Sequence, residues 1–325
     1  MGTGIVIVTY NSESVAGACL DSCAREAPGA EVVVVDNASS DGTAGQVRRR
    51  KAVRLIVNRE NRGFAGAVNQ GVEALAGCER ILLLNPDAEI VRGVAALEEI
   101  CGRAGVGAAA GCLAGAGGAP QAGFGIRRLP TPATLAFEAL GINRLWPGNP
   151  VNRRYRCAGF DWTRESDVEQ PAGAFLMFRR DAWRRIGGFD ERFHPAWFED
   201  VDFCRRLLGA GYRIRYTPAA VARHAGGHSA AGLPWEWRER FWYASLLKYG
   251  AKHFRAGGRL AASLAVMLGS VLRLVSAVLG RKPAGGALRV YAGVIGLAVG
   301  SLRGCGPLDR PEAGRAQQPP DTGEE

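Results

Sequence analysis

Carboxylate and amide side chains follow an apolar run in the first third of the chain. Residues 81–84 are all Ile or Leu, and they lead directly into Asn85, Pro86 and Asp87. A short apolar run ended by turn residues is typical of a buried strand, and α/β sheets bind ligands outside the carboxyl ends of such strands. Because Mg²⁺ and Mn²⁺ prefer carboxylate oxygens, Asp87 is a candidate metal ligand, with Asn85 beside it. The alternative is an ordinary turn.

A second acidic cluster, Glu199, Asp200 and Asp202, follows an aromatic run at 193–198. Spacings of three and four residues predict a helix whose apolar face should pack on the sheet: Phe198, Val201, Cys204 and Leu208. Glu199 points nearly opposite that face, and Asp200 lies at its boundary. A carboxylate at the edge of a cleft can act as a general base, which the preceding aromatic residues favour. The alternative is a favourable interaction of these acids with the helix dipole.

His224 follows a strand predicted at 211–216 and precedes a glycine-rich segment at 225–229. Imidazole suits Mn²⁺ and other transition ions, so His224 could be a further ligand of a metal held by Asp87. His228 is a second candidate. The glycine-rich segment could close over a substrate and exclude water. A structural or exposed histidine is the alternative.

Alternating strands and helices should position these side chains. Residues 4–9, 31–35 and 53–57 predict three strands, so that the chain forms an α/β fold with a parallel sheet. Asp36 ends the second strand and could accept from a ribose hydroxyl or a base, or could be a turn or cap residue. Gly63 and Gly66 allow a close approach to phosphate at a helix N-terminus, where Arg62 adds positive charge. Because no GxGxxG follows the first strand, we expect no Rossmann dinucleotide site.

The middle of the chain is less regular. Residues 101–125 contain nine Gly and predict a surface excursion or a weak strand pair. Basic and aromatic residues interleave at 126–165, either as a lining for an anionic or sugar ligand or as a solvated face. A further strand is predicted at 170–178, followed by a short helix at 179–190 that ends at a pair of glycines.

The C-terminal quarter is basic and partly apolar. Residues 235–310 carry 12 Lys or Arg against 3 Asp or Glu, which is nearly the whole net charge of +10. A nucleic-acid binder would carry basic residues across the whole fold, so we expect an anionic membrane surface as partner and no nucleic acid. Residues 260–279 could span a bilayer by length, but the internal Arg273 favours a helix in the membrane interface, or one paired with 287–302. Two ordinary core helices are the alternative.

Cysteine usage and the termini suggest a cellular location. The eight cysteines show no paired CxxC spacing, which suits a reducing cytoplasm. We see no signal peptide at the N-terminus, and residues 304–325 predict a disordered tail. We therefore expect a cytoplasmic protein, peripheral at the inner face of the cell membrane.

A family resemblance is carried by six ordered motifs: Val8-Thr9-Tyr10-Asn11, Val35-Asp36-Asn37-Ala38-Ser39-Ser40-Asp41-Gly42-Thr43, Asn61-Arg62-Gly63-Phe64-Ala65-Gly66-Ala67-Val68-Asn69, Leu84-Asn85-Pro86-Asp87, Phe198-Glu199-Asp200-Val201-Asp202 and His224-Ala225-Gly226-Gly227-His228-Ser229. Together they resemble the family 2 inverting glycosyltransferases, most closely the rhamnosyltransferase-like branch. The resemblance covers residues 4–255 and implies a GT-A-type fold, with a nucleotide-binding α/β half and an acceptor-binding half around one sheet. We expect a glycosyltransferase domain at 1–255, apolar basic helices at a membrane interface at 256–303, and the tail at 304–325.

The same resemblance implies residue roles. Asp200 matches the catalytic base, with Glu199 as its neighbour. Asn85-Pro86-Asp87 matches the DxD element with Asn at the first position, which removes one carboxylate. Asp87, helped by His224, would then carry most of the binding of Mg²⁺ or Mn²⁺. The implied nucleotide-sugar-binding residues are Thr9, Tyr10, Asn11, Asp36, Asn37, Arg62, Gly63, Phe64, Gly66, Asn69, Asn85 and Asp87.

The implied reaction is inverting transfer of a sugar from a nucleotide-diphosphate donor, and the sugar we expect is L-rhamnose from dTDP-rhamnose. The acceptor would be a saccharide or a lipid-linked saccharide in cell-envelope polysaccharide synthesis. No motif fixes the sugar or the base, so another UDP- or GDP-sugar donor is one alternative. A non-catalytic membrane-associated scaffold with the same fold is another, and the intact Glu199-Asp200 pair argues against it.

Overall fold

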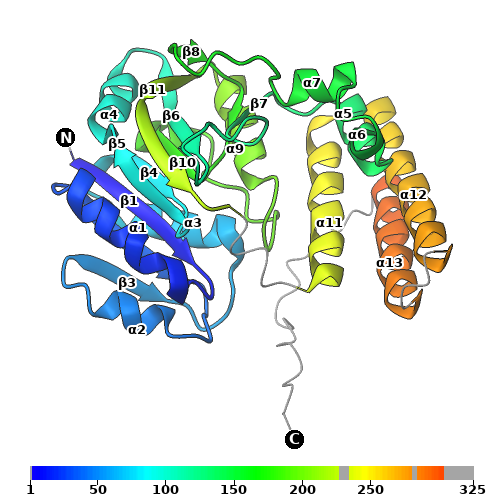
Figure 1. The fold of residues 1–325 in the computed structure, drawn as a ribbon, viewed down its shortest axis with the longest axis horizontal. Helices are drawn as coiled ribbons and strands as arrows, with labels where there is room; N and C mark the ends of the chain where they lie inside the picture. Colours follow the sequence, from blue (N-terminus) through cyan, green and yellow to red (C-terminus); the bar gives the residue numbers. More distant parts are fainter. Residues whose placement is uncertain (1, 227–233, 280–283, 304–325) are drawn as a thin grey trace, which may run out of the picture.

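A mixed sheet with helices on both faces lies beside a group of helices (Figure 1). The computed structural model describes residues 2–226, 234–279 and 284–303. His228 and the predicted tail at 304–325 lie outside these residues. The predicted α/β fold with a parallel-rich sheet is confirmed.

Within the described residues the main sheet has nine strands, in the order β3-β2-β1-β4-β10-β6-β11-β5, with β8 paired to β11. Its first four strands are parallel, whereas β10 is antiparallel to β4 and β6, and β5 is antiparallel to β11. The strands of the main sheet are β1 (Gly2–Thr9), β2 (Glu31–Asp36), β3 (Val53–Val57), β4 (Cys78–Leu84), β5 (Ala88–Arg92), β6 (Val106–Ala114), β8 (Ser166–Asp167), β10 (Phe175–Arg179) and β11 (Arg213–His224). A separate antiparallel pair consists of β7 (Ile126–Arg127) and β9 (Gln170–Pro171).

Successive side chains of β1 enter two different cores, because alternate residues of a strand face opposite sides of a sheet. Val6 and Val8 pack with α3 (Gly63–Ala74), α8 (Arg180–Arg185) and α9 (Glu199–Gly209). Ile5 and Ile7 pack with α1 (Glu13–Glu26), α2 (Thr43–Arg48) and α4 (Val94–Gly102). The carboxyl ends of β1, β2 and β4 therefore lie side by side, between two helical layers.

The glycine- and alanine-rich segment forms part of the sheet, so the prediction of a surface excursion or a weak strand pair is wrong for residues 106–114. These residues form β6, which is buried at all nine positions between β10 and β11. Small side chains are required there. A Cβ on Gly107 would lie 2.8 Å from Tyr212, and one on Gly111 would lie 2.5 Å from Phe175.

The strand predicted at 170–178 is divided. Residues 170–171 pair with β7, and β10 begins only at Phe175. Residues 172–174 connect the two strands, and this connection contributes to the site described below.

The helical group consists of α5 (Pro132–Ala139), α6 (Ile142–Leu145), α7 (Pro150–Tyr155), α11 (Trp235–His253), α12 (Ala256–Leu279) and α13 (Ala284–Leu302). Its core is shared with the α/β unit, because Phe198 and Val201 pack in one cluster with Leu246 of α11, Val266 of α12 and Val294 of α13. Among the described helices, the segment Ala256–Ala277 is long and apolar enough to cross a membrane by length and composition alone. The boundary between residues 255 and 256 stays a prediction.

Candidate active site

The parallel register places Thr9 opposite Asp36 at the carboxyl ends of β1 and β2. The hydroxyls of Thr9 and Ser39 donate to Asp36 Oδ1 over 2.9 and 2.6 Å, and the Ser39 N–H donates to Asp36 Oδ2 over 3.1 Å. Asp36 thus closes the turn after β2, as the turn alternative predicted. A carboxylate has about four acceptor positions, so Oδ2 keeps capacity for one more donor.

Asn11 joins this turn to the one after β1. Its backbone has a left-handed φ of 49°, its N–H donates to Ser39 Oγ over 2.9 Å, and its Oδ1 accepts from the Ser40 N–H over 2.8 Å. Half-buried Tyr10 precedes it. Residues 9–11 and 36–40 therefore form one continuous wall at the sheet edge.

Asn37 is committed to internal contacts. Its Nδ2 donates to Asn61 Oδ1 and the Gly63 carbonyl, and its Oδ1 accepts from the Arg62 N–H and Asn58 Nδ2. The side chain is buried. Asn37 therefore holds the loop after β3 in place, and its amide has little capacity left for a ligand.

Asn69 is similarly engaged within the protein. Its Oδ1 accepts from the Phe189 N–H and Trp183 Nε1, and its Nδ2 donates to the Phe189 carbonyl and Glu191 Oε1. A contact with the nucleotide sugar would require breaking these bonds, so the structure favours a supporting role.

The start of α3 packs closely against residues 194–195. Gly63 has a φ of +73°, and a Cβ there would lie 2.8 Å from the His194 ring. The Phe64 N–H donates to the Pro195 carbonyl over 2.7 Å, and a Cβ on Gly66 would lie 3.4 Å from the Glu191 carboxylate. These glycines allow α3 to pack against residues 194–195. The predicted phosphate contact therefore depends on the side chain of Arg62, which is exposed.

Asp87 and His224 are brought together by β11, which pairs antiparallel with β5 so that His224 lies opposite Ala88. The Nε2 atom of His224 lies 3.4 Å from Asp87 Oδ1, and both side chains are almost fully buried. Nε2 makes no hydrogen bond. A buried imidazole nitrogen facing a carboxylate fits a divalent cation bound between them.

Gln121 determines which nitrogen of His224 carries the proton. Its Nε2 donates to the His224 carbonyl over 2.8 Å, which fixes the amide orientation, so its Oε1 accepts from His224 Nδ1–H over 3.0 Å. In the neutral form of the ring, this contact places the proton on Nδ1 and the lone pair of Nε2 towards Asp87. Phe124 stacks on the same ring, with centroids 5.4 Å apart. Such support is typical of metal-binding histidines.

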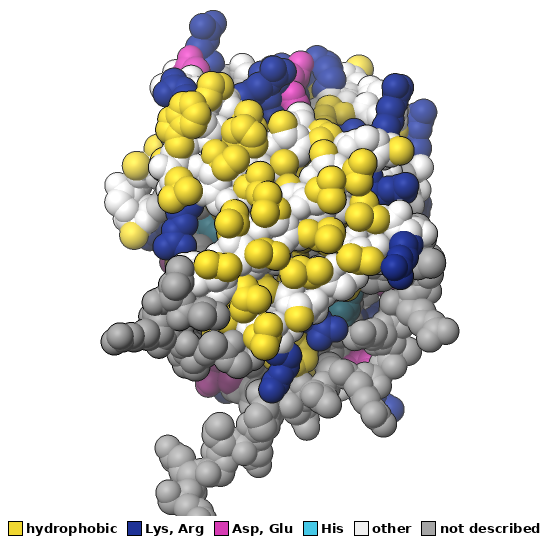
Figure 2. Space-filling view, turned by 90° about the vertical axis from the view of Figure 1, so that its right-hand side faces the viewer, with side chains coloured by type: hydrophobic (Ala, Val, Ile, Leu, Met, Phe, Trp, Pro, Cys, Tyr) yellow, Lys and Arg dark blue, Asp and Glu magenta, His cyan; other side chains and the backbone are white. Residues whose placement is uncertain are grey.

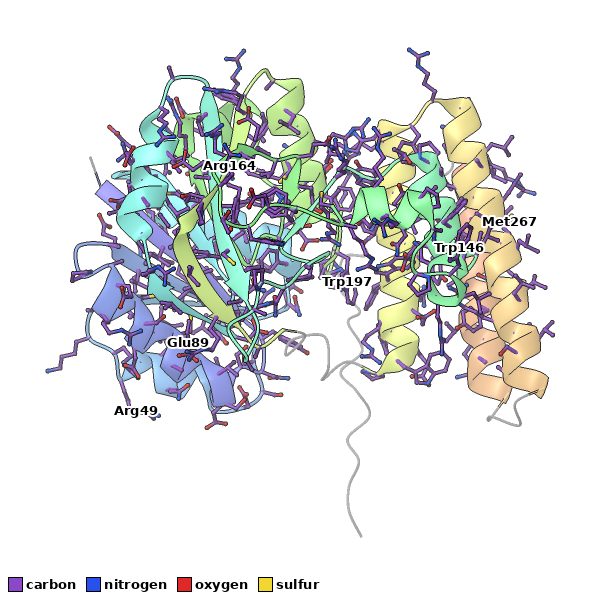
Figure 3. All side chains as sticks on the ribbon, turned by 45° about the horizontal axis from the view of Figure 1, so that its top comes forward. Arg49, Glu89, Trp146, Arg164, Trp197 and Met267 are labelled. Atoms are coloured by element: carbon purple, nitrogen blue, oxygen red, sulfur yellow. The ribbon has the colours of Figure 1, made fainter. Side chains whose placement is uncertain are left out.

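Asp200 occupies the first turn of α9. Its Oδ2 accepts from the Gly173 N–H over 3.1 Å and from Gln170 Nε2 over 3.4 Å, while its Oδ1 accepts from the Val201 N–H over 2.8 Å. Phe198, just before the helix, has a left-handed φ of 69°, as does Trp197 (74°), which lies between the α/β unit and α11 (Figure 3). Such strained residues cluster at functional sites.

Glu199 is buried, and its Oε2 has no hydrogen-bond partner. Burial, and then the negative charge of Asp200, raise the pKa of Glu199 well above its ordinary value. Asp200 is half-buried and reaches solvent, whereas Glu199 is held in the protein interior.

Glu199→Gln is expected to stabilise the protein increasingly as pH rises. A carboxyl whose pKa is raised on folding contributes stability below its unfolded pKa of about 4.3, and this contribution is lost as pH rises through the folded value. Urea unfolding of wild type and variant at a series of pH values measures the difference. A difference that does not change with pH would contradict the assignment.

One short connection joins the two halves of the site. The Asn85 N–H donates to the Ala174 carbonyl over 3.0 Å, and the Gly173 N–H donates to Asp200. A Cβ on Gly173 would lie 3.2 Å from the Asp200 Cβ, so glycine permits this approach. Residues 173–174 therefore fix the catalytic candidate relative to the Asn85-Pro86-Asp87 turn.

Asp202 anchors α9 to α11. It is fully buried, accepts from Arg206 Nε over 2.7 Å, and pairs with Lys252 Nζ over 2.6 Å and His253 Nε2 over 2.7 Å. Burial alone would raise the pKa of Asp202, but the His253 hydrogen bond and the charges of Arg206 and Lys252 lower it.

Asp202→Ala should reduce the free energy of unfolding by about 1–3 kcal/mol, because the half-buried donors of Arg206, Lys252 and His253 lose a shared acceptor. Chemical denaturation at neutral pH measures the loss. Exposed Glu60→Ala is the control, and equal stability of the two variants would contradict the anchoring role.

No pattern in the sequence marks the supporting residues Gln121, Gln170 and Gly173. Gln121 lies in the irregular residues 101–125, and its contact with His224 spans 103 positions. No local signal marks such a residue, because its role depends on the pairing of distant strands.

Three features together define a GT-A-type fold. They are the strand order of the main sheet, the oxygen-bearing side chains at the carboxyl ends of its strands, and the acidic first turn of α9. A mannosyltransferase from Pyrobaculum calidifontis, solved in complex with GDP-Man and Mn²⁺, has a TM-score of 0.51 at 19% identity, over 92% of this chain and 86% of that chain. GalNAc-T7, solved with UDP, GalNAc and Mn²⁺, has a TM-score of 0.55 at 14% identity, over 87% of this chain and 58% of that chain.

Residues 4–158 match Glycosyl transferase family 2, and residues 158–280 match Glycosyl transferase family group 2. N-acetylglucosaminyl-diphospho-decaprenol L-rhamnosyltransferase of Mycobacterium tuberculosis (strain ATCC 25618 / H37Rv) is 30% identical over 226 residues, 66% of this chain and 72% of that protein. Rhamnosyltransferase WbbL of Escherichia coli (strain K12) is 31% identical over 106 residues, 32% of this chain and 36% of that protein. The chain belongs to glycosyltransferase family 2 and is rhamnosyltransferase-like, which confirms the resemblance.

Proposed function

We propose that this glycosyltransferase transfers L-rhamnose, with inversion, from dTDP-rhamnose to a lipid-linked saccharide in cell-envelope polysaccharide synthesis. The observation that carries the transfer reaction is the connection at 173–174, which holds Asp200 beside the turn that carries Asp87. The choice of sugar and acceptor is supported by the relatives named rhamnosyltransferase, one of them named for a lipid-linked diphospho-sugar.

Asp87 and His224 fit the divalent cation that the fold family implies. Their facing oxygen and nitrogen atoms are buried, and the His224 nitrogen lacks a hydrogen-bond partner. Within the part of the chain that the structure describes, no group of three or more His, Cys, Asp or Glu side chains could hold a metal ion. Remaining ligands would come from donor phosphates and water, as is common for Mg²⁺. A bound Mg²⁺ or Mn²⁺ would offset the negative charge that develops on the leaving diphosphate.

Asp200 acts as the general base in this proposal. Its carboxylate removes the proton from an acceptor hydroxyl, and that oxygen attacks the anomeric carbon from the face opposite the diphosphate, so configuration inverts. The Gly173 N–H and Gln170 hold Oδ2 in position. The wall formed by residues 9–11 and 36–40 binds the nucleoside, with Arg62 near the phosphates.

The first experiment measures nucleotide release from dTDP-, UDP- and GDP-sugars with Mn²⁺, Mg²⁺ or EDTA. Metal-dependent release from dTDP-rhamnose supports the proposal. If nucleotide were released from a UDP- or GDP-sugar but not from dTDP-rhamnose, that sugar would replace dTDP-rhamnose as the assigned donor. Neither binding nor release of any donor would favour the non-catalytic scaffold.

Gln121→Leu is expected to raise the dissociation constant for Mn²⁺ by about 10-fold or more, because such supporting contacts typically contribute 10–100-fold to metal affinity. Electron paramagnetic resonance of Mn²⁺ with dTDP measures the affinity, and ¹⁵N NMR reports the His224 tautomer. Gln46→Leu, on α2, is the matched control. Unchanged affinity and tautomer in Gln121→Leu would rule out this role.

A further inference from the structure

A row of exposed apolar side chains runs along α12. Its members are 45–54% exposed: Leu260, Leu264, Leu268, Val271, Leu272 and Val275. Their spacings of three and four residues place them on one side of the helix. Leu288 of α13 is 55% exposed. Figure 2 shows a broad apolar surface on this side of the molecule, which we call the α12 face.

The fold does not require the α12 face to be apolar. The opposite side of α12 already supplies the buried contacts, through Ala262, Ala265 and Val266, which lie in or beside the core shared with α5, α11 and α13. Large exposed apolar patches on soluble proteins usually mark interaction sites. The α12 face is therefore a candidate interaction surface.

Charge identifies the kind of partner. Residues 256–303 contain no Asp or Glu, whereas Arg255 and Arg303 are exposed at ends of α12 and α13, and Arg289 is exposed in the second turn of α13. Lys and Arg side chains border the apolar surface in Figure 2. A second copy across a two-fold axis would bring this basic border against an identical one. Anionic phospholipid headgroups complement it.

Arg273 does not interrupt the apolar row. Its guanidinium donates to the Ala139 carbonyl of α5 and to the Gly269 carbonyl, so its charge is turned towards the protein. The internal charge that counted against a bilayer-spanning helix is thus part of the contact between α12 and α5.

The packing of α12 also indicates how this helix would be oriented relative to a membrane. One side of α12 contacts α5 and α11, and α11 exposes Arg238 and Arg240. A membrane-spanning α12 would carry these charged neighbours into the hydrocarbon, at a high cost in free energy. A helix lying in the interface buries only its apolar face, about 5–10 Å deep.

We propose that the α12 face docks the enzyme on an anionic phospholipid surface, with α12 lying in the plane of the membrane. Docking itself does not depend on the proposed reaction. Only its role rests on the proposed function, because that role is to hold the active site near a lipid-linked acceptor. Asp202 connects α9 to α11, so docking would place Asp200 at a fixed height above the lipid.

The test uses the full chain and vesicles of phosphatidylglycerol and phosphatidylethanolamine, with phosphatidylcholine vesicles as the neutral comparison, and no sugar nucleotide. Wild type should sediment with the anionic vesicles, and the double variant Leu268→Asp/Leu272→Asp should bind at least tenfold more weakly. Val91→Asp, an exposed apolar position on β5, should bind like wild type. Arg289→Glu should weaken binding to the anionic vesicles only.

Thermal unfolding checks that each variant is folded, and donor binding is measured separately, so failure of the proposed reaction is distinguishable from failure of docking. Equal vesicle binding by wild type and the folded double variant would overturn the proposal. The proposal would also be overturned if the wild type formed a dimer that the double substitution abolishes and did not bind vesicles. Resistance to alkaline carbonate extraction would overturn the in-plane orientation.

Discussion

Asp200→Asn is expected to lower the rate of sugar transfer by about 10²–10⁴-fold, the usual contribution of a general base. Asparagine keeps the shape of the side chain and can accept from the Gly173 N–H, but its amide cannot take the acceptor proton. Donor binding should therefore stay close to wild type. Nucleotide release in the presence of acceptor measures the rate, and titration with dTDP-rhamnose measures binding.

Glu199→Gln is the matched control for Asp200→Asn. It changes the adjacent carboxyl in the same way, but this side chain is buried in the protein interior. The control should retain transfer within a small factor of wild type. Full activity in Asp200→Asn, or an equal loss in the control, would show that the base has been misassigned.

Asp87→Ala is expected to lower kcat/KM by about 10³-fold or more, because a metal ion contributes several kcal/mol to stabilising a charged transition state. The variant removes the carboxylate that faces His224 and leaves the imidazole without a partner for a shared cation. Dependence of donor binding on Mn²⁺ should also disappear. Isothermal titration with dTDP-rhamnose in Mn²⁺ and in EDTA measures this dependence.

Glu89→Ala provides the control for Asp87→Ala. Glu89 lies two residues further along the chain on β5, where its carboxylate lies 3.9 Å from the guanidinium of exposed Arg223. The control should keep its metal dependence. If Asp87→Ala bound the donor equally well in Mn²⁺ and EDTA at wild-type affinity, metal binding by Asp87 would be excluded.

Local patterns in the sequence determined the alternating strands and helices, the polar residues at the ends of β1, β2 and β4, and the acidic first turn of α9. Each of these features depends on residues within a few positions of one another, through side-chain alternation, helical spacing and turn preference. Four candidate residues were therefore identifiable before their arrangement was known, namely Asp36, Asp87, Asp200 and His224, whereas Thr9 was implied only by the family resemblance.

Only the tertiary structure decided which of these residues meet and which are committed elsewhere. The pairing of β11 with β5 brings His224 to Asp87, and the connection at 173–174 holds Asp200 near the same sheet edge. Asn37, by contrast, is fully engaged inside the protein. Strand order determined these outcomes, and it depends on contacts between segments far apart in the chain, which local propensity does not encode.

The same reason explains the error at β6. Glycine and alanine have low strand propensity, so a sequence window rich in them predicts a loop. In the folded protein, Tyr212 and Phe175 lie so close to Gly107 and Gly111 that only small residues fit between them. The small residues that made the segment look irregular are those that the crowded centre of the sheet requires.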